Sequence, residues 1–401
     1  MNRVLIANLA SPANPGDHAI LQGSLKLIRE TLKPAAVTLV TRAYSQKEAY
    51  LESGCEVVPS FPDVDKLNLE DSLRKILRIP AALGNPWPLA EAVKKADCIF
   101  LAGGAYFYSY RKAFPGLTYL AHVSPVFLAK KSCPVIFLPQ SYGPFGSKIS
   151  KKLFRYSLGR AKKVFYREDV SADVLRGNFA ALKNKFAFMP DHALYLEKSD
   201  LLDAPVLPVS SSPKIIGVTI RPWHEGGLDA GIYMEILAQA LEVFAQEHKA
   251  IIRIIVQVQD DKRLEGDETI SLLLKTRLLK SLPPEQVELY TRKPFFTLGE
   301  ISSLYAQCHV MVSMRLHSAL LGYILGCPAL VAGYQHKASG ILEKLGLNDL
   351  YLGAYHDITK EDVLNGLNQV WSRRASYQQR IEAALNETRG LIRKGFEECL
   401  K

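Results

Sequence analysis

The chain has 401 residues, of which 50 are lysine or arginine and 40 are aspartate or glutamate, so its net charge is +10, and 48% are apolar. At roughly 100–200 residues per domain, this length predicts two or three domains, and the apolar fraction excludes a disordered or fibrous chain. No apolar run reaches the roughly 18 residues of a membrane span, and the first residues lack the layout of a signal peptide. The six cysteines form no CxxC pair. We therefore expect a soluble, cytoplasmic protein with free thiols.

Short β-rich runs alternate with helix-length amphipathic segments along most of the chain. In the first half the pattern predicts strands at 4–8, 37–41, 98–101, 135–138 and 164–166, and a helix at 17–32. The alternation restarts with strands at 215–220, 251–258, 287–290, 310–313 and 329–332 and a helix near 232–248. Such alternation is typical of parallel sheets wrapped by helices.

A stretch rich in proline and serine, residues 199–214, separates the two halves and is the best linker candidate. We therefore predict an α/β fold with two Rossmann-like domains that face each other across a cleft. Residues 1–205 form the first domain and residues 206–401 the second, and the helices after about residue 361 are expected to cross back onto the first. Ligands of such sheets bind outside the carboxyl ends of the strands, so the functional residues are expected in the loops that follow the strands.

Cationic side chains follow several predicted strands of the second half. Arg315 and His317 come directly after the run 310–312, at the start of a predicted helix, where free backbone amides add to the positive field. Arg221 follows the strand 215–220, and Lys337 follows the strand 329–332. Cations at three strand ends favour a phosphate or carboxylate ligand over a neutral sugar alone.

The loops of the first half are less specific. Asn14-Pro15-Gly16-Asp17 precedes the first predicted helix, where Asp17 fits a helix N-cap and Gly16 fits the close approach of a ligand, and the pattern leaves both open. Gly103-Gly104 follows a buried strand but lacks the GxGxxG spacing of a dinucleotide site. No cluster has the spacing of a zinc site, so we expect no metal and no cofactor.

Residues 148–167 contain eight basic residues and no acidic one. Lys148, Lys152 and Arg155 recur at helical spacing, with Phe154 and Leu158 on the opposite, core-facing side. The pattern fits a solvated helix face, and it also fits a surface that meets anionic lipid headgroups or a pyrophosphate-linked acceptor. The sequence has no nucleic-acid-binding motif, so we expect no nucleic-acid partner.

Taken together, these motifs resemble the polysaccharide pyruvyl transferases, in matching order from residue 8 to about residue 346. The resemblance rests on Asn14-Pro15-Gly16-Asp17, Gly103-Gly104, Pro139-Gln140-Ser141-Tyr142-Gly143-Pro144, Arg167 with Ser171, Pro190-Asp191, Ser313-Met314-Arg315-Leu316-His317-Ser318, Tyr334 and Lys337. The segment around Arg315 is its most specific part. Ala105 and His192 depart from the family pattern, where a third glycine and a proline are common.

The resemblance implies a fold like that of the GT-B glycosyltransferases and transfer of the pyruvyl group of phosphoenolpyruvate to a sugar, forming a ketal and releasing phosphate. It implies phosphoenolpyruvate binding by Arg315, Leu316, His317 and Lys337, with Arg221 and Arg167 as further candidates. His317 would donate a proton or stabilise phosphate, and Asp17 would orient or deprotonate the acceptor. The acceptor side would consist of Asn14, Gly16, Asp17, Gly103, Gly104, Gln140 and Ser141.

The implied partners are phosphoenolpyruvate and a glycan acceptor, which a lipid pyrophosphate could carry at the inner face of the cytoplasmic membrane. Two alternatives remain open from the sequence. One is a GT-B glycosyltransferase or sugar-nucleotide enzyme, whose cations would bind a nucleotide diphosphate. The other is a family member that binds without transferring. The first differs from a pyruvyl transferase in its donor, and the second predicts binding without phosphate release.

Overall fold

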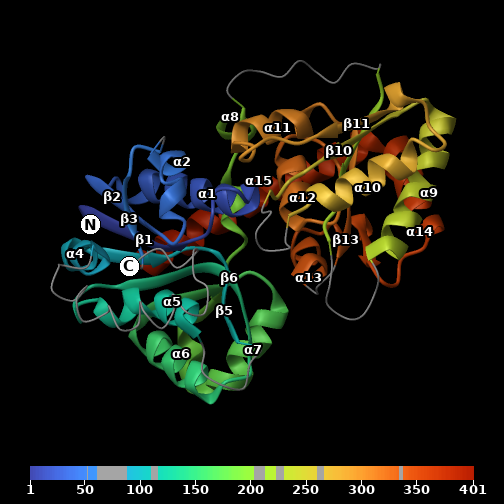
Figure 1. The fold of residues 1–401 in the computed structure, drawn as a ribbon. Helices are drawn as coiled ribbons and strands as arrows, with labels where there is room; N and C mark the ends of the chain where they lie inside the picture. Colours follow the sequence, from blue (N-terminus) through green and yellow to red (C-terminus); the bar gives the residue numbers. More distant parts are fainter. Residues whose placement is uncertain are drawn as a thin grey trace. The chain divides into compact units, whose positions relative to one another are not determined.

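The structure is a computed structural model, and it describes residues 1–51, 53–60, 88–109, 116–202, 213–222, 230–259, 266–333 and 337–401. In these ranges two separate parallel β-sheets form, each connected by helices (Figure 1). The α/β fold class predicted from the alternation of short apolar runs and amphipathic segments is confirmed.

The first sheet has eight strands in the described part of the chain. Its order is β3-β2-β1-β4-β6-β7-β8, and β5 pairs with β6 beside this path. The strands are β1 (Arg3–Leu9), β2 (Ala36–Thr41), β3 (Glu56–Pro59), β4 (Cys98–Leu101), β5 (Gly104–Ser109), β6 (Val135–Phe145), β7 (Ala161–Tyr166) and β8 (Phe186–Phe188).

The second sheet has six described strands in the order β11-β10-β9-β12-β13-β14. They are β9 (Ile215–Thr219), β10 (Ile251–Ile255), β11 (Val287–Tyr290), β12 (Val310–Ser313), β13 (Ala329–Gly333) and β14 (Tyr351–Ala354). In both sheets the chain first builds outward in one direction and then returns to the other side of the first strand. This is the strand order of doubly wound, Rossmann-like sheets, whose ligands bind where the direction reverses.

Helices link the strands in both halves. The α-helices are α1 (Pro15–Leu32), α2 (Glu48–Leu51), α4 (Pro88–Lys95), α5 (Gly116–Leu128), α6 (Lys148–Arg160), α7 (Asp169–Phe179), α8 (Lys198–Leu201), α9 (Ala230–His248), α10 (Glu268–Leu278), α11 (Leu298–Ala306), α12 (Leu316–Ile324), α13 (Lys337–Lys344), α14 (Lys360–Ser372) and α15 (Arg374–Leu400). Short 3-10 helices are η1 (Tyr44–Gln46), η2 (Ala180–Lys185), η3 (His192–Tyr195), η4 (Pro284–Gln286) and η5 (Asn348–Leu350).

The chain divides into two compact units. Unit 1 comprises Met1–Pro12, Ile20–His192 and Leu391–Lys401, and unit 2 comprises Ala13–Ala19 and Ala193–Gly390. The division therefore falls at residue 192, whereas the composition shift suggested residue 205, which lies outside the described residues. The first turn of α1 belongs to unit 2 although the rest of the helix belongs to unit 1, and the end of α15 belongs to unit 1.

Most predicted elements occur within one to three residues of the expected bounds, and the differences have physical reasons. The predicted strand at 251–258 ends at residue 255, and beyond it the Val258 amide donates to the Asp267 carboxylate. The predicted strand at 135–138 continues to residue 145 as β6, since β5 supplies a pairing partner that the apolar pattern does not reveal. The first helix begins at Pro15 rather than Asp17, which corrects the predicted N-cap.

Aromatic rings fill the core of unit 1. Phe154 of α6 is fully buried, and its ring centroid lies 4.9 Å from that of Phe107, 5.0 Å from that of Phe145 and 5.4 Å from that of Phe179. Leu158 is likewise buried one turn later. The prediction that these two residues of the basic helix face the core is therefore confirmed, and burial of this face orients the helix.

His192, which stands where the family pattern commonly has a proline, is part of the core of unit 1. The imidazole is buried, with Nδ1 2.9 Å from the Ser24 hydroxyl and Nε2 3.1 Å from the Met189 sulfur. Burial lowers the pKa of His192 from 6.5 to about 4, and the Asp191 charge opposes this shift. Burial and the Arg42 charge lower the pKa of His122 to about 3. Both histidines are therefore neutral in the folded protein near neutral pH.

These shifts predict that the protein loses stability in mild acid. Between pH 6.5 and about 4 the unfolded chain binds a proton at each histidine while the folded chain does not, so stability falls as pH falls. Each histidine should lower the free energy of unfolding by about 2 kcal/mol between about pH 7 and 5. Urea unfolding at both pH values measures this, and His192→Gln should flatten the dependence. Equal unfolding free energies at the two pH values would contradict the prediction.

All six cysteines are free and buried: Cys55, Cys98, Cys133, Cys308, Cys327 and Cys399. The prediction of free thiols is confirmed. Among the helices that the structure describes, none combines the length and apolar character required to cross a membrane.

Candidate functional site

Two arginines are brought to the same edge of the sheet in unit 2 by strand register. β9 and β12 pair in parallel, with Thr219 opposite Ser313. Arg221 and Arg315 each lie two residues beyond this pair. Since β10 lies on the far side of β9 and β13 on the far side of β12, the two arginines lie where the strand order reverses. This is the position at which doubly wound sheets bind ligands.

Arg315 is held by a buried carboxylate that the sequence analysis missed. Its Nε donates to Asp267 Oδ2 at 2.7 Å and its Nη2 donates to Oδ1 at 2.6 Å. The Arg315 side chain is 12% exposed, and that of Asp267 is fully buried. The Val258 amide donates to the same carboxylate at 3.1 Å. This two-bond geometry fixes the plane of the guanidinium.

Positive charges outnumber the single negative charge around Asp267. Burial raises the pKa of the Asp267 carboxyl, while the charges of Arg315 and Arg221 and the hydrogen bonds to this carboxyl oppose the rise. One buried carboxylate thus faces two guanidinium groups. An added anion would improve the local charge balance, while Nε and Nη2 of Arg315 stay bonded to Asp267.

The start of α12 places His317 beside these cations. Arg315 is the N-cap residue, so Leu316 and His317 occupy the first turn of the helix, where backbone amides point outward. The Ser318 hydroxyl donates to the Arg315 carbonyl at 2.6 Å and lies 2.7 Å from the Thr219 hydroxyl. These bonds tie the helix start to the end of β9, and His317 is half-buried.

The loop before α1 meets His317. A side chain at Gly16 would place its Cβ 2.6 Å from His317 Cβ and 2.7 Å from Cγ, so only glycine fits. Asn14 caps the helix through the Gly16 amide, which donates to Asn14 Oδ1 at 3.1 Å, and Asn14 Nδ2 donates to Asp17 at 2.9 Å. We expected Asn14, Gly16 and Asp17 in the first domain, but their contacts assign them to unit 2, on the side of His317.

The remaining expected acceptor residues gather in unit 1. Gly104 lies opposite Gln140 in the pairing of β5 with β6, and a Cβ at Gly103 would lie 2.7 Å from the Pro139 carbonyl oxygen. Gln140 and Ser141 are buried, with 0% and 3% exposure. The structure therefore brings these four residues together, and it buries the two side chains that would bind a sugar.

Arg167 lies in unit 1 and has a buried acidic partner of its own. Its guanidinium forms an ion pair with Asp191, and its Nε donates to the Ser141 hydroxyl at 3.1 Å. The side chain is 5% exposed. It therefore belongs to a different unit from Arg221, Arg315, Leu316 and His317, which share unit 2 with the loop of Gly16.

Lys337 is the first residue of α13, which follows β13, the neighbour of β12. Its side chain and Tyr334 lie outside the described part of the structure, so its expected place beside His317 stays a prediction. In the described ranges no group of three or more His, Cys, Asp or Glu residues could hold a metal ion.

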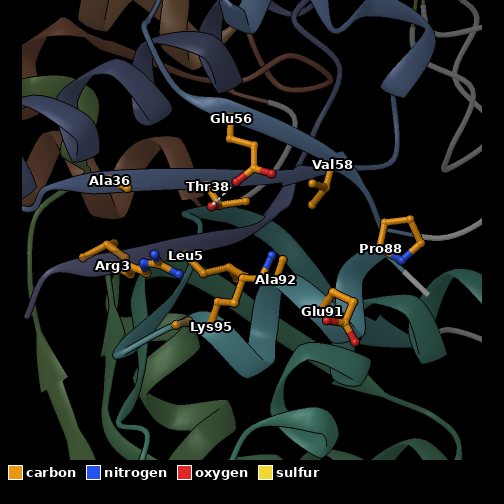
Figure 2. Close-up of a pocket in the computed structure, with 12 residues that line it drawn as sticks. Arg3, Leu5, Ala36, Thr38, Glu56, Val58, Pro88, Glu91, Ala92 and Lys95 are labelled. Atoms are coloured by element: carbon orange, nitrogen blue, oxygen red, sulfur yellow. Dashed lines mark hydrogen bonds between the residues drawn. The ribbon is translucent and has the colours of Figure 1, made fainter. Parts of the chain in front are cut away.

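A cavity of about 420 Å³ lies in unit 1, bounded by β1, β2, β3 and α4 (Figure 2). Its lining includes Arg3 and Ala36, the first residues of β1 and β2. The cavity therefore lies at the amino ends of these strands, whereas the candidate site is built at the carboxyl ends of strands in unit 2.

The fold is shared with several solved structures. A glycosyltransferase from Rickettsia africae matches with a TM-score of 0.63 and 14% identity, over 100% of this chain and 99% of that one. UDP-GlcNAc 2-epimerase from Neisseria meningitidis, bound to UDP-GlcNAc, matches over the same shares with a TM-score of 0.61 and 11% identity. HepE from Anabaena, in complex with UDP-glucose, gives 0.59 and 13%, again over 100% and 99%. These likenesses define the fold as that of the GT-B class.

Within that class the sequence motifs decide the family. The family model for polysaccharide pyruvyl transferase matches residues 14–336, and the chain belongs to this family. The chain is also similar to the amylovoran biosynthesis protein AmsJ of Erwinia amylovora, with 21% identity over 429 residues that cover 100% of this chain and 99% of AmsJ. The resemblance inferred from the sequence is confirmed. The matched region includes Gly16, Arg221, Arg315 and His317 and ends one residue before Lys337.

Proposed function

We propose that this protein transfers the pyruvyl group of phosphoenolpyruvate to a sugar of a cell-surface polysaccharide, or of its lipid-linked precursor, forming a ketal and releasing phosphate. The observation that carries the proposal is the register that places Arg221 and Arg315 together at the strand reversal, with His317 in the first turn of the helix that Arg315 caps. Phosphoenolpyruvate presents a phosphate and a carboxylate on a small skeleton, which calls for several cations. Family membership and similarity to an amylovoran biosynthesis protein support the same assignment and a role in exopolysaccharide synthesis.

The chemistry follows from the donor. C3 of phosphoenolpyruvate accepts a proton, C2 becomes oxocarbenium-like, and a sugar hydroxyl attacks C2. The C2–O bond to phosphate then breaks, phosphate leaves with the bonding electrons, and a second hydroxyl of the sugar closes the ketal. One hydroxyl proton replaces the proton given to C3, and the other leaves with phosphate, so the atoms balance. These steps use phosphoenolpyruvate as a substrate and need no other cofactor.

The residues of unit 2 suit distinct parts of this reaction. Arg315, kept in plane by Asp267, and Arg221 would bind the phosphate or the carboxylate, and Lys337 would add a third cation. His317 would donate the proton to C3 or stabilise the leaving phosphate, because imidazole changes charge near neutral pH. Asp17, bonded to Asn14 on the turn beside His317, would orient or deprotonate the acceptor hydroxyl. In this proposal the protein acts in the cytoplasm, and its acceptor is presented at the inner face of the membrane.

Phosphate release from phosphoenolpyruvate, measured across a panel of acceptor glycans, tests the proposal. Phosphate is expected only when donor and a suitable acceptor are both present, and the glycan product should gain the mass of a pyruvyl ketal. Because the acceptor is unidentified, donor binding is measured separately as a thermal shift. Phosphoenolpyruvate at about 100 times its Kd should stabilise the protein by about 2.7 kcal/mol.

The same panel includes nucleotide sugars as alternative donors. A thermal shift with UDP-sugars but none with phosphoenolpyruvate would overturn the proposal in favour of a glycosyltransferase or sugar-nucleotide enzyme. Phosphoenolpyruvate binding without phosphate release on any acceptor would instead indicate a binding protein that has lost transfer.

A further inference from the structure

The outer face of α5 and α6 in unit 1 combines exposed aromatic rings with cations. Phe127 of α5 and Tyr156 of α6 stack with their ring centroids 4.5 Å apart, although the two residues are 44% and 48% exposed. Ile149, two turns before Tyr156 on the same face of α6, is 46% exposed. An aromatic pair that packs on itself and still faces water is unusual for a purely solvated helix surface.

Cations border these apolar side chains on the same two helices. Lys148, Lys152 and Arg155 are exposed on α6, and Lys130 and Lys131 are exposed in the turn after α5. We call the exposed residues Phe127, Lys130, Lys131, Lys148, Ile149, Lys152, Arg155 and Tyr156 the basic-aromatic face. On α6, Lys148, Lys152 and Arg155 follow one another at intervals of about one helical turn. Positive charge therefore extends along most of the exposed side of this helix.

No carboxylate in this part of the sequence offsets that charge. From Cys98 to Arg167 the chain has 70 consecutive residues without an aspartate or glutamate. The face therefore has no local acidic partners from either helix or from the strand between them, β6. By contrast, the exposed leucines of α10, Leu272 and Leu273, lie on a helix that begins with Glu268.

We propose that the basic-aromatic face docks unit 1 on an anionic lipid bilayer. Lys and Arg side chains near such a surface are attracted to its headgroups, and amphipathic rings sit at the boundary between headgroups and acyl chains. A soluble polyanion would use the cations but would give the exposed Phe127 and Ile149 nothing apolar to contact, which favours the bilayer. That docking brings the enzyme to a lipid-linked acceptor rests on the proposed function, whereas the docking itself does not.

The test is co-sedimentation of the full chain with vesicles, without phosphoenolpyruvate or acceptor. The protein is expected to bind vesicles of mixed phosphatidylglycerol and phosphatidylcholine at about 0.01 M salt, where the Debye length is about 30 Å, and to release at about 1 M, where it is about 3 Å. It should not bind phosphatidylcholine alone. Since each cation near the surface raises partitioning roughly fivefold, reversing Lys148, Lys152 and Arg155 to Glu should lower it by at least about 100-fold.

Matched variants separate this face from net charge. Lys33→Glu, Lys280→Glu and Lys394→Glu together change the net charge by the same amount at exposed sites elsewhere, and they should weaken binding far less. Phe127→Ser with Tyr156→Ser should lower vesicle binding at about 0.01 M salt, where the cations alone still attract the protein, while Leu272→Ser with Leu273→Ser should not. Circular dichroism and thermal unfolding check that each variant folds.

Three results would overturn the proposal. They are no binding of the wild type to anionic vesicles at low salt, equal losses for the two sets of charge reversals, and binding to a soluble polyanion such as heparin without binding to vesicles. Because no substrate is present, a failure of phosphate release in the earlier assay would leave this result standing, and the reverse also holds.

Discussion

A lysine in place of Arg315 is expected to lower kcat/KM for phosphoenolpyruvate by about 100-fold, or about 2.7 kcal/mol of transition-state stabilisation. Lysine keeps the positive charge but loses the planar fork that makes two bonds to Asp267. The lysine ammonium is then no longer held in one orientation, and the buried Asp267 carboxylate loses one of the two hydrogen bonds that it accepts from this side chain. Steady-state kinetics of phosphate release and a thermal shift with phosphoenolpyruvate measure the two consequences.

Arg277 provides the matched control for this substitution. It also makes a two-bond ion pair, with Nε and Nη2 each 2.7 Å from the Glu235 carboxylate, but it links α9 to α10 at a partly exposed position. Arg277→Lys should leave kcat/KM within about twofold, because a partly exposed pair contributes little. If the two variants lose equal activity, Arg315 acts through stability alone and the assigned role is wrong.

The contribution of Asp267 is read from the same assay. Asp267→Asn keeps the shape of the side chain and removes its charge, so Arg315 is held by weaker bonds. If Asp267 acts by positioning Arg315, Asp267→Asn should lower kcat/KM in the wild type but add little in the Arg315→Lys background, since residues that act as a unit are not additive. A purely structural carboxylate would instead lower stability in both backgrounds without this dependence.

The sequence predicted the strand ends well and the side-chain partners poorly. Arg221 and Arg315 were found because cations follow apolar runs, and parallel strands bring such positions to one edge. Asp267 was missed because it lies 48 residues from Arg315 and precedes a helix, where an aspartate is usual for local reasons. Nothing in its neighbourhood reveals a partner so distant along the chain.

The path of the chain between the units explains why the loop before α1 was expected in the other domain. Asn14, Gly16 and Asp17 follow the first strand of unit 1, so their position in the sequence favours a site on that sheet. The structure instead assigns Ala13–Ala19 to unit 2, while the residues on both sides of this short segment belong to unit 1. Composition and periodicity report which residues are buried, and they carry no information about which of two cores a single helix turn joins.

The close contact between Gly16 and His317 is set by the position of the backbone and cannot be relieved by rotating a side chain. The atoms that a Cβ at this position would meet first are Cβ and Cγ of His317, at 2.6 and 2.7 Å. Cβ of His317 is fixed by the backbone of α12, so rotation of the imidazole cannot relieve the overlap. The helix start itself would have to shift, and it also holds the Arg315 backbone.

Gly16→Ala is therefore expected to lower kcat for phosphate release by at least about tenfold, because a shift of His317 by a fraction of an ångström misaligns a proton donor. Alanine in a helix normally stabilises relative to glycine, but here overpacking should cost about 1–3 kcal/mol. Gly177→Ala in α7 is the control, since nothing lies within 4 Å of a Cβ there, and it should leave both kcat and stability unchanged or slightly improved. Kinetics and thermal unfolding of both variants decide the matter. If Gly16→Ala retains full kcat, the first turn of α1 does not position His317, and Asp17 on the same turn loses its place in the reaction.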